Sequence, residues 1–102
     1  MGTATTALGQ GLLVTPVQLI SAYNAIANNG VYVPLQLIRE YAHEDGTREV
    51  PPPAVPYQVV STSAAAQVRA MLENAVAVGT GVNAQVEGYR VAGKTGTARK
   101  AL

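Results

Sequence analysis

The chain has 102 residues, of which 48% are hydrophobic but only 5% aromatic, with no Phe, Trp or Cys. A chain of this length holds at most one hydrophobic core, which must here be built from Val, Leu, Ile and Ala. The formal net charge of +1 excludes the basic footprint of a nucleic-acid-binding protein, and the lack of cysteine excludes disulfides, thiolate metal sites and a cysteine nucleophile.

The N-terminal region carries no targeting signal. The apolar stretch after residue 11 is interrupted by Thr15, Pro16 and Gln18, and no Lys or Arg precedes Arg39. A signal peptide needs a charged start followed by a continuous apolar region, and a membrane span needs about 20 apolar residues. We therefore expect any membrane anchor of the protein to lie outside these residues.

A first helix is expected over about 16–28. Thr15 suits the N-cap, Pro16 suits the first helical position, and Gln18 completes a Thr-x-x-Gln capping box. The run Asn28-Asn29-Gly30 is typical of a left-handed C-terminal stop. Apolar residues between these signals recur at helical spacing, namely Leu19, Ile20, Tyr23, Ile26 and Ala27.

The middle of the chain predicts a hairpin. Residues 31–33 and 35–41 are β-prone, and Asp45-Gly46 is a hairpin-turn signal. Residues 48–50 can return as the second strand. The segment 51–56 holds four prolines, which have no amide hydrogen to donate, so we expect an extended surface connection within one domain.

A second helix is expected after Ser61, which suits an N-cap. It should end at Gly79-Thr80-Gly81. Residues 89–98 then favour a strand interrupted by glycine, which often marks the close approach of another backbone or a ligand. The face of the helix expected to pack in the core is formed by Val68, Met71, Leu72, Ala75 and Val76.

Two interpretations compete for the C-terminal residues, and the first is nucleotide binding. Residues 88–95 match the phosphate-loop pattern G-x-x-x-x-G-K-[ST], in which backbone amides and the lysine hold phosphates. That pattern needs a strand before it and a helix after it. Residues 83–87 make a poor buried strand and Thr95-Gly96-Thr97 a poor helix start, so nucleotide binding is the weaker interpretation.

The second interpretation starts from Lys94-Thr95-Gly96, the third sequence element of penicillin-binding proteins and serine β-lactamases. From about Gly9 to Lys100 the chain resembles class B penicillin-binding proteins of the division and elongation type. The resemblance implies an α+β fragment of the transpeptidase fold, with helices packed on an antiparallel sheet. It rests on the order and spacing of Gly9-Gln10-Gly11, Thr15-Pro16, Asn29-Gly30, Val33-Pro34, Ala65-Ala66-Gln67-Val68-Arg69, Gly79-Thr80-Gly81 and residues 88–98.

The resemblance assigns a role to each residue of the motif. The family cross-links peptidoglycan by acyl transfer from a D-Ala-D-Ala stem peptide. Lys94 would place a positive charge that orients a neighbouring serine and attracts the carboxylate of the substrate or of a β-lactam. Thr95 and Thr97 would offer hydroxyls to that carboxylate, and Gly96 would leave room for the acyl group. The Thr97 backbone amide would be one oxyanion-hole donor.

The chain departs from the family pattern because the nucleophile is missing. The family needs a Ser-x-x-Lys and a Ser-x-Asn element. The chain's three serines are Ser21, Ser61 and Ser63, and none of them begins either element. Residues 1–102 are therefore expected to be part of one transpeptidase domain, truncated at both ends and inactive alone. The parent protein would act at the extracytoplasmic face of a bacterial membrane.

No cofactor, metal or nucleic acid is expected to bind. The expected partners of the parent are the stem peptide and β-lactams, with membrane contact only through a segment absent here. A non-enzymatic binding or interaction module that keeps this part of the fold is the other alternative.

Overall fold

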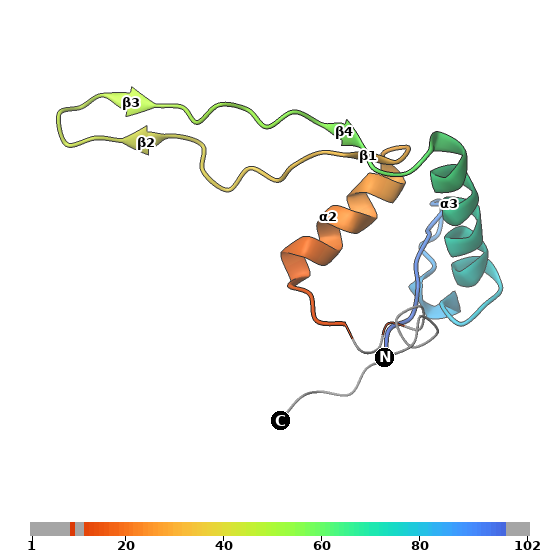
Figure 1. Cartoon of the computed structure of the whole chain (residues 1–102). Helices are drawn as coiled ribbons and strands as arrows, with labels where there is room; N and C mark the ends of the chain where they lie inside the picture. The colour runs from red at the N-terminus through yellow and green to blue at the C-terminus, as the bar shows by residue number, and fades with distance from the viewer. Residues whose placement is uncertain (1–8, 10–11, 98–102) are drawn as a thin grey trace.

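The computed structural model describes Gly9 and residues 12–97, and it belongs to the α+β class (Figure 1). Both strand pairs in this part of the chain are antiparallel, which confirms the predicted class. In chain order the elements are α2 (Pro16–Ala27), β1 (Val31–Tyr32), β2 (Tyr41–Ala42), β3 (Arg48–Glu49), β4 (Tyr57–Gln58), α3 (Thr62–Ala77) and the 3-10 turn η1 (Val82–Ala84).

Helix α2 begins and ends where the sequence predicts. The Thr15 hydroxyl accepts a hydrogen bond from the Gln18 amide at 3.1 Å, and the Gln18 side chain accepts one from the Thr15 amide at 2.9 Å. This capping box satisfies two amides that a helix start would otherwise leave unpaired. At the other end Asn29 and Gly30 have φ values of 58° and 82°, the predicted left-handed stop.

Gly30 joins the first half of the chain to the second. Its carbonyl oxygen accepts hydrogen bonds from the amides of Val59 at 2.9 Å and Val60 at 3.4 Å. Beside it, β1 pairs with β4, and the rings of Tyr32 and Tyr57 lie 5.3 Å apart. Strand β4 is not predicted by the sequence, because two residues show no alternation that marks them as a strand.

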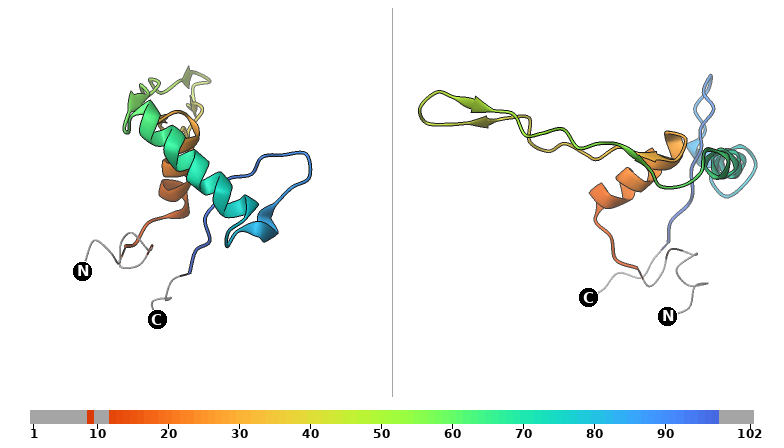
Figure 2. Two further views of the ribbon diagram at one scale, coloured as in Figure 1. Left: turned by 90° about the vertical axis from the view of Figure 1, so that its right-hand side faces the viewer. Right: turned by 45° about the horizontal axis from the view of Figure 1, so that its top comes forward.

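A long arm formed by residues 33–56 extends from the two helices (Figures 1 and 2). The predicted hairpin is confirmed at its tip, where β2 pairs with β3. Of the expected strand over 35–41, only Tyr41 is paired. The reason is that the facing part of the return segment contains Pro51, Pro52 and Pro53, which cannot donate to a strand ladder.

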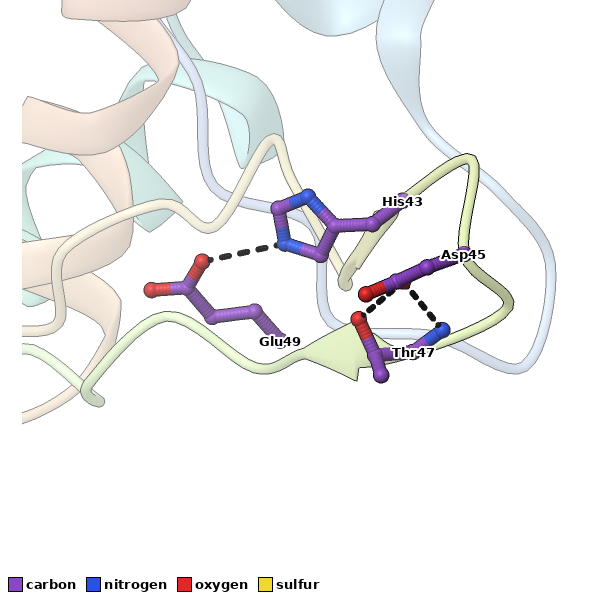
Figure 3. Close-up of polar contacts among 4 residues, drawn as sticks. All are labelled: His43, Asp45, Thr47 and Glu49. Carbon is purple, nitrogen blue, oxygen red and sulfur yellow. Dashed lines mark hydrogen bonds and ion pairs between the residues drawn. The ribbon is translucent and has the colours of Figure 1, made fainter.

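The turn at the tip of the arm is stabilised by side chains (Figure 3). Gly46 has a φ of 85°, and its amide donates to the His43 carbonyl at 3.0 Å. The Asp45 carboxylate accepts from the Thr47 hydroxyl at 2.6 Å and from the Thr47 amide at 2.9 Å. These bonds lower the pKa of Asp45, the hydroxyl contributing most. His43 contacts Glu49 at 3.3 Å.

Helix α3 packs on α2 through small residues and one arginine. The Ser61 hydroxyl caps it, as predicted, by accepting from the Ala64 amide at 3.0 Å. Ala25 and Ala65 are buried, so the two helices can approach closely. The Arg69 guanidinium reaches across to donate to the Ile26 carbonyl at 2.9 Å, which satisfies a carbonyl at the C-terminal end of α2.

The predicted core faces of both helices are only partly correct. Val76 is 2% exposed and Leu72 half-buried, but Met71 is 66% exposed, because no element in the described part of the chain lies over it. On α2 the predicted stripe at Leu19 and Ile20 is also exposed. Side chains of small volume fill the contact between the helices instead, so the helices turn other faces inward than the apolar spacing suggests.

Much apolar surface stays open around this small core. The Cα radius of gyration is 18.0 Å, against about 13 Å for a compact domain of this length. An open groove of about 850 Å³ runs between α2, the β1–β4 pair and the base of the arm. It is lined mainly by apolar side chains, among them Val17, Ala22, Ile26, Tyr32, Leu35 and Val60.

Replacing Gly30 with alanine should strongly destabilise the fold. A Cβ at this position would clash with the Val60 carbonyl oxygen, in a left-handed conformation that already disfavours a side chain. We expect Gly30→Ala to lower the free energy of unfolding by about 3 kcal/mol, the upper end of the usual range. Urea denaturation followed by circular dichroism measures this change.

Gly46→Ala is the matched control. Gly46 has nearly the same φ, but no atom of the described residues beyond its chain neighbours lies within 4 Å of the point where its Cβ would stand. The substitution should therefore cost only the left-handed strain of about 1–2 kcal/mol. Equal losses for the two variants would contradict the close approach at Gly30.

Candidate functional site

The four residues of the Lys-Thr-Gly motif region lie on an exposed coil beside α3. A turn at Gly88, with a φ of 83° and a bond from the Tyr89 amide to the Val86 carbonyl at 3.0 Å, sends the chain back along the helix. Residues 91–97 then contain no strand, which differs from the prediction for 89–98. No strand in the described part lies beside them to supply ladder hydrogen bonds. Ala98 lies outside the described residues.

The coil is held against α3 at Gly93. The Gly93 amide donates to the Leu72 carbonyl at 3.1 Å, and a Cβ on Gly93 would meet the Val76 side chain at 3.4 Å. The predicted close approach of another backbone to a glycine is therefore confirmed at this position. Gly96 differs, because no atom of the described residues beyond its chain neighbours lies within 4 Å of where its Cβ would stand, so the space beside it is open.

Lys94 and Thr95 form a small polar cluster with Thr80. The Lys94 ammonium donates to the Thr95 carbonyl at 2.7 Å and lies 3.4 Å from the Thr95 hydroxyl. That hydroxyl lies 3.4 Å from the hydroxyl of Thr80. Thr80 belongs to the segment predicted to end α3. The stretch Lys94 to Thr97 is exposed throughout. Within residues 12–97 no carboxylate pairs with Lys94, so its charge can meet an anionic ligand.

An ion pair connects the same coil to α3 four residues before Lys94. Arg90 donates two hydrogen bonds to the Glu73 carboxylate, from Nε to Oε1 at 2.5 Å and from Nη2 to Oε2 at 2.7 Å. The bond from Arg90 lowers the pKa of Glu73, and the carboxylate raises the pKa of Arg90. Both groups are therefore charged at neutral pH, and the sequence alone does not predict the pair.

The chain's three serines take structural positions. Ser21 is 7% exposed, and its hydroxyl donates to the Val17 carbonyl at 2.8 Å. Ser61 caps α3, and the Ser63 hydroxyl accepts a hydrogen bond from the Gln67 side-chain Nε2 at 3.2 Å, one turn along the helix. These contacts are those of helix residues, and among the described residues none of the three serines forms a hydrogen bond with a lysine or histidine.

The phosphate-loop interpretation lacks its helix. It requires a helix that begins at Lys94-Thr95 and points its N-terminal amides at a phosphate. Residues 91–97 are coil, and the segment 83–87 is a 3-10 turn followed by coil rather than a buried strand.

The part of the chain that the structure describes also shows no group of three metal-ligating side chains and no helix with the length and apolarity of a membrane span.

Comparison with known proteins identifies the family. The family described as the penicillin binding protein transpeptidase domain matches residues 1–102. This chain belongs to that family. The resemblance drawn from the motifs is thereby confirmed, and so is the α+β class that it implies. No solved structure matches the chain significantly.

The relatives are longer proteins of bacteria. Stage V sporulation protein D of Bacillus subtilis is 46% identical over 99 residues, and PbpB of Mycobacterium tuberculosis is 43% identical over 100. The peptidoglycan D,D-transpeptidase FtsI of Escherichia coli is 40% identical over 98. These matches cover 95%, 91% and 95% of this chain but 15% of each relative.

The contacts of Thr80, Glu73 and Arg90 are not predicted by the sequence. The sequence places Thr80 only in the stop after α3, and Glu73 only on a polar face of that helix. Thr80 and Thr95 are 15 residues apart in sequence, and Glu73 and Arg90 are 17 apart. No local spacing rule covers such sequence separations. The one available signal is that Arg90 lies within the motif-bearing segment itself.

The Glu73–Arg90 pair predicts a pH dependence of stability. Because the pKa of Glu73 is lowered in the folded chain from its ordinary value of 4.5, its contribution is fully present above that value and is lost as the pH falls through the lower folded pKa. Glu73→Gln should therefore lower the Tm by a few degrees near neutral pH, and the difference should vanish on acidification.

Thermal unfolding from neutral to strongly acidic pH checks this expectation. Glu44→Gln, which removes one negative charge at the exposed tip of the arm, is the control. A Tm difference for Glu73→Gln that stays constant at low pH would contradict the charge pairing.

Proposed function

We propose that this chain is the part of a penicillin-binding D,D-transpeptidase that presents the carboxylate-binding residues of the active site. The observation that carries the proposal is the exposed run from Lys94 to Thr97, which lies beside α3 with an ammonium group that no described carboxylate neutralises. The membership of the chain in the transpeptidase family and the name of the E. coli relative support it.

The reaction of the parent is a two-step acyl transfer. A serine oxygen attacks the carbonyl of the penultimate D-Ala of a stem peptide, and the terminal D-Ala leaves with a proton on its amine. An amine of a second stem peptide then attacks the acyl-enzyme, and the serine recovers its proton. A β-lactam would imitate the D-Ala-D-Ala end and stop at the acyl-enzyme, because its leaving amine stays tethered. The serine and its base would come from a part of the parent outside this chain.

Each exposed group of the motif has a place in this reaction. The Lys94 ammonium would bind the terminal carboxylate, together with the hydroxyls of Thr95 and Thr97. The open side at Gly96 would let the acyl chain lie against the backbone. The Thr97 amide would donate to the oxygen on which charge develops during attack, which stabilises the transition state.

We further propose that residues 1–102 are one part of a larger transpeptidase domain. Relatives that match nearly the whole chain are several times longer. The open apolar groove along α2 and the exposed side chains of Leu13, Leu37 and Met71 would be covered by the rest of that domain. In the parent a membrane segment outside this chain would hold the domain at the extracytoplasmic face.

A chimeric enzyme tests the role of Lys94. Residues 1–102 would replace the matched segment of the peptidoglycan D,D-transpeptidase FtsI of E. coli, and the rest of that enzyme would supply the remaining parts of the site. We expect a fluorescent penicillin to acylate this chimera, and Lys94→Ala to slow acylation roughly a hundredfold. Arg39→Ala, which removes one positive charge from the exposed arm, should leave the rate unchanged.

The oxyanion role of Thr97 has its own matched pair. Thr97→Ala keeps the backbone donor and loses one hydroxyl, so it should slow acylation about tenfold or less. Thr97→Pro removes the donor and should slow acylation by a further factor of about 100 or more.

Equal rates for Lys94→Ala and the unaltered chimera would overturn the assignment of the motif.

The isolated chain should form no covalent penicillin adduct, because it lacks the Ser-x-x-Lys element. Mass spectrometry of the 102-residue chain after incubation with a fluorescent penicillin measures this directly. A stoichiometric adduct would overturn the assignment of the nucleophile to another part of the parent. Saturable, reversible binding of a stem peptide to the chain alone would instead favour the alternative of a non-enzymatic binding module.

A further inference from the structure

Two contacts attach the motif-bearing coil to α3 immediately before Lys94. One is the double hydrogen bond between Arg90 and Glu73, and the other is the bond from the Gly93 amide to the Leu72 carbonyl at 3.1 Å. Their partners on the helix are neighbours in sequence, and their partners on the coil are three residues apart. Two attachment points at this separation fix both the position of the coil along α3 and its rotation about its own axis.

The geometry of the ion pair suits positioning. An arginine fork that binds both carboxylate oxygens is directional, whereas a lysine would act as a point charge. The Arg90 side chain is 85% exposed, but that of Glu73 is only 32% exposed. Glu73 is therefore the less exposed partner of the pair, and it stands on the helix against which the coil lies.

The end of α3 that holds these contacts is itself well supported. The amides of Gly79 and Gly81 both donate to the Ala75 carbonyl, at 3.1 and 3.0 Å. The Gln85 side chain donates to the Val76 and Ala77 carbonyls, each at 3.0 Å. The last carbonyls of a helix have no partner within it, and here the following loop satisfies them. The helix end is thus a firm base for the coil.

We infer that Glu73 and Arg90 are positioning residues that hold Lys94 and the Thr97 amide in register with the substrate. This inference rests on the proposed transpeptidase function. Neither side chain would touch the substrate or the reacting atoms. Their effect would pass through the backbone from Arg90 to Lys94, where a displacement of the order of an ångström can cost a large factor in rate.

Amide hydrogen exchange on the 102-residue chain tests the structural half of the inference. Arg90→Gln should speed exchange of the Gly93 amide roughly threefold, the range expected for losing an exposed ion pair. Arg48→Gln breaks the pair with Glu40 in the arm and should leave the Gly93 amide unchanged. The charge swap of Glu73→Arg with Arg90→Glu should restore slow exchange. Unchanged exchange in Arg90→Gln would overturn the inference.

Acylation kinetics of the chimera test the catalytic half. Arg90→Gln should lower the acylation rate constant about tenfold while changing the dissociation constant of the noncovalent penicillin complex less. Arg90→Lys, which keeps the charge but not the fork, should fall between, and the charge swap should recover most of the rate. Arg48→Gln measures what loss of a comparable ion pair does by stability alone.

The outcomes separate this inference from the proposed function. Slow acylation in Lys94→Ala together with an unaltered rate in Arg90→Gln would keep the function and overturn the positioning role. A normal rate in Lys94→Ala would overturn the function, and the exchange measurement would then still decide whether the ion pair positions the coil. A loss in Arg90→Gln no larger than in Arg48→Gln, without recovery in the charge swap, would also overturn the positioning role.

Discussion

The close approach of Gly30 to the chain at Val60 holds the two halves of the described structure together. Gly30 lies in the turn after α2. Its carbonyl accepts from the amides that precede α3, and the Gln58 side chain donates to the neighbouring Asn29 carbonyl at 2.9 Å. The helices contact each other through alanines and Arg69. With so few buried apolar residues, backbone hydrogen bonds around one glycine carry much of the organisation that a larger core would supply.

The arm shows how proline limits a sheet. Its two sides run from the β1–β4 pair to the hairpin at the tip and lie apart between these two pairs (Figure 1). Three consecutive prolines, Pro51 to Pro53, remove donors from one side, and the ladder survives only at the ends of the arm. The same prolines keep an exposed pair of strands from offering a long unpaired edge to other chains.

The candidate site combines a well-capped helix, α3, with an exposed coil that carries Lys94 to Thr97. Helix α3 is capped at Ser61 and tied down at its C-terminal end by Gln85 and two glycine amides. The coil that carries Lys94 to Thr97 lies against this helix. No carboxylate of the described residues pairs with the Lys94 ammonium. A site that binds a carboxylate needs this combination, because a neutralised or mobile ammonium would bind an anion weakly.

The sequence by itself determined local structure and the family. Caps and left-handed stops depend on neighbouring residues, so Thr15, Ser61 and Asn29-Gly30 could be read directly, and the motif around Lys94 pointed to penicillin-binding proteins. Tertiary structure alone decided the pairing of β4 with β1, the exposure of Met71 and the contacts of Arg90 with Glu73 and Thr80 with Thr95. These depend on which distant segments meet, and neither periodicity nor spacing within one helix or strand carries that information.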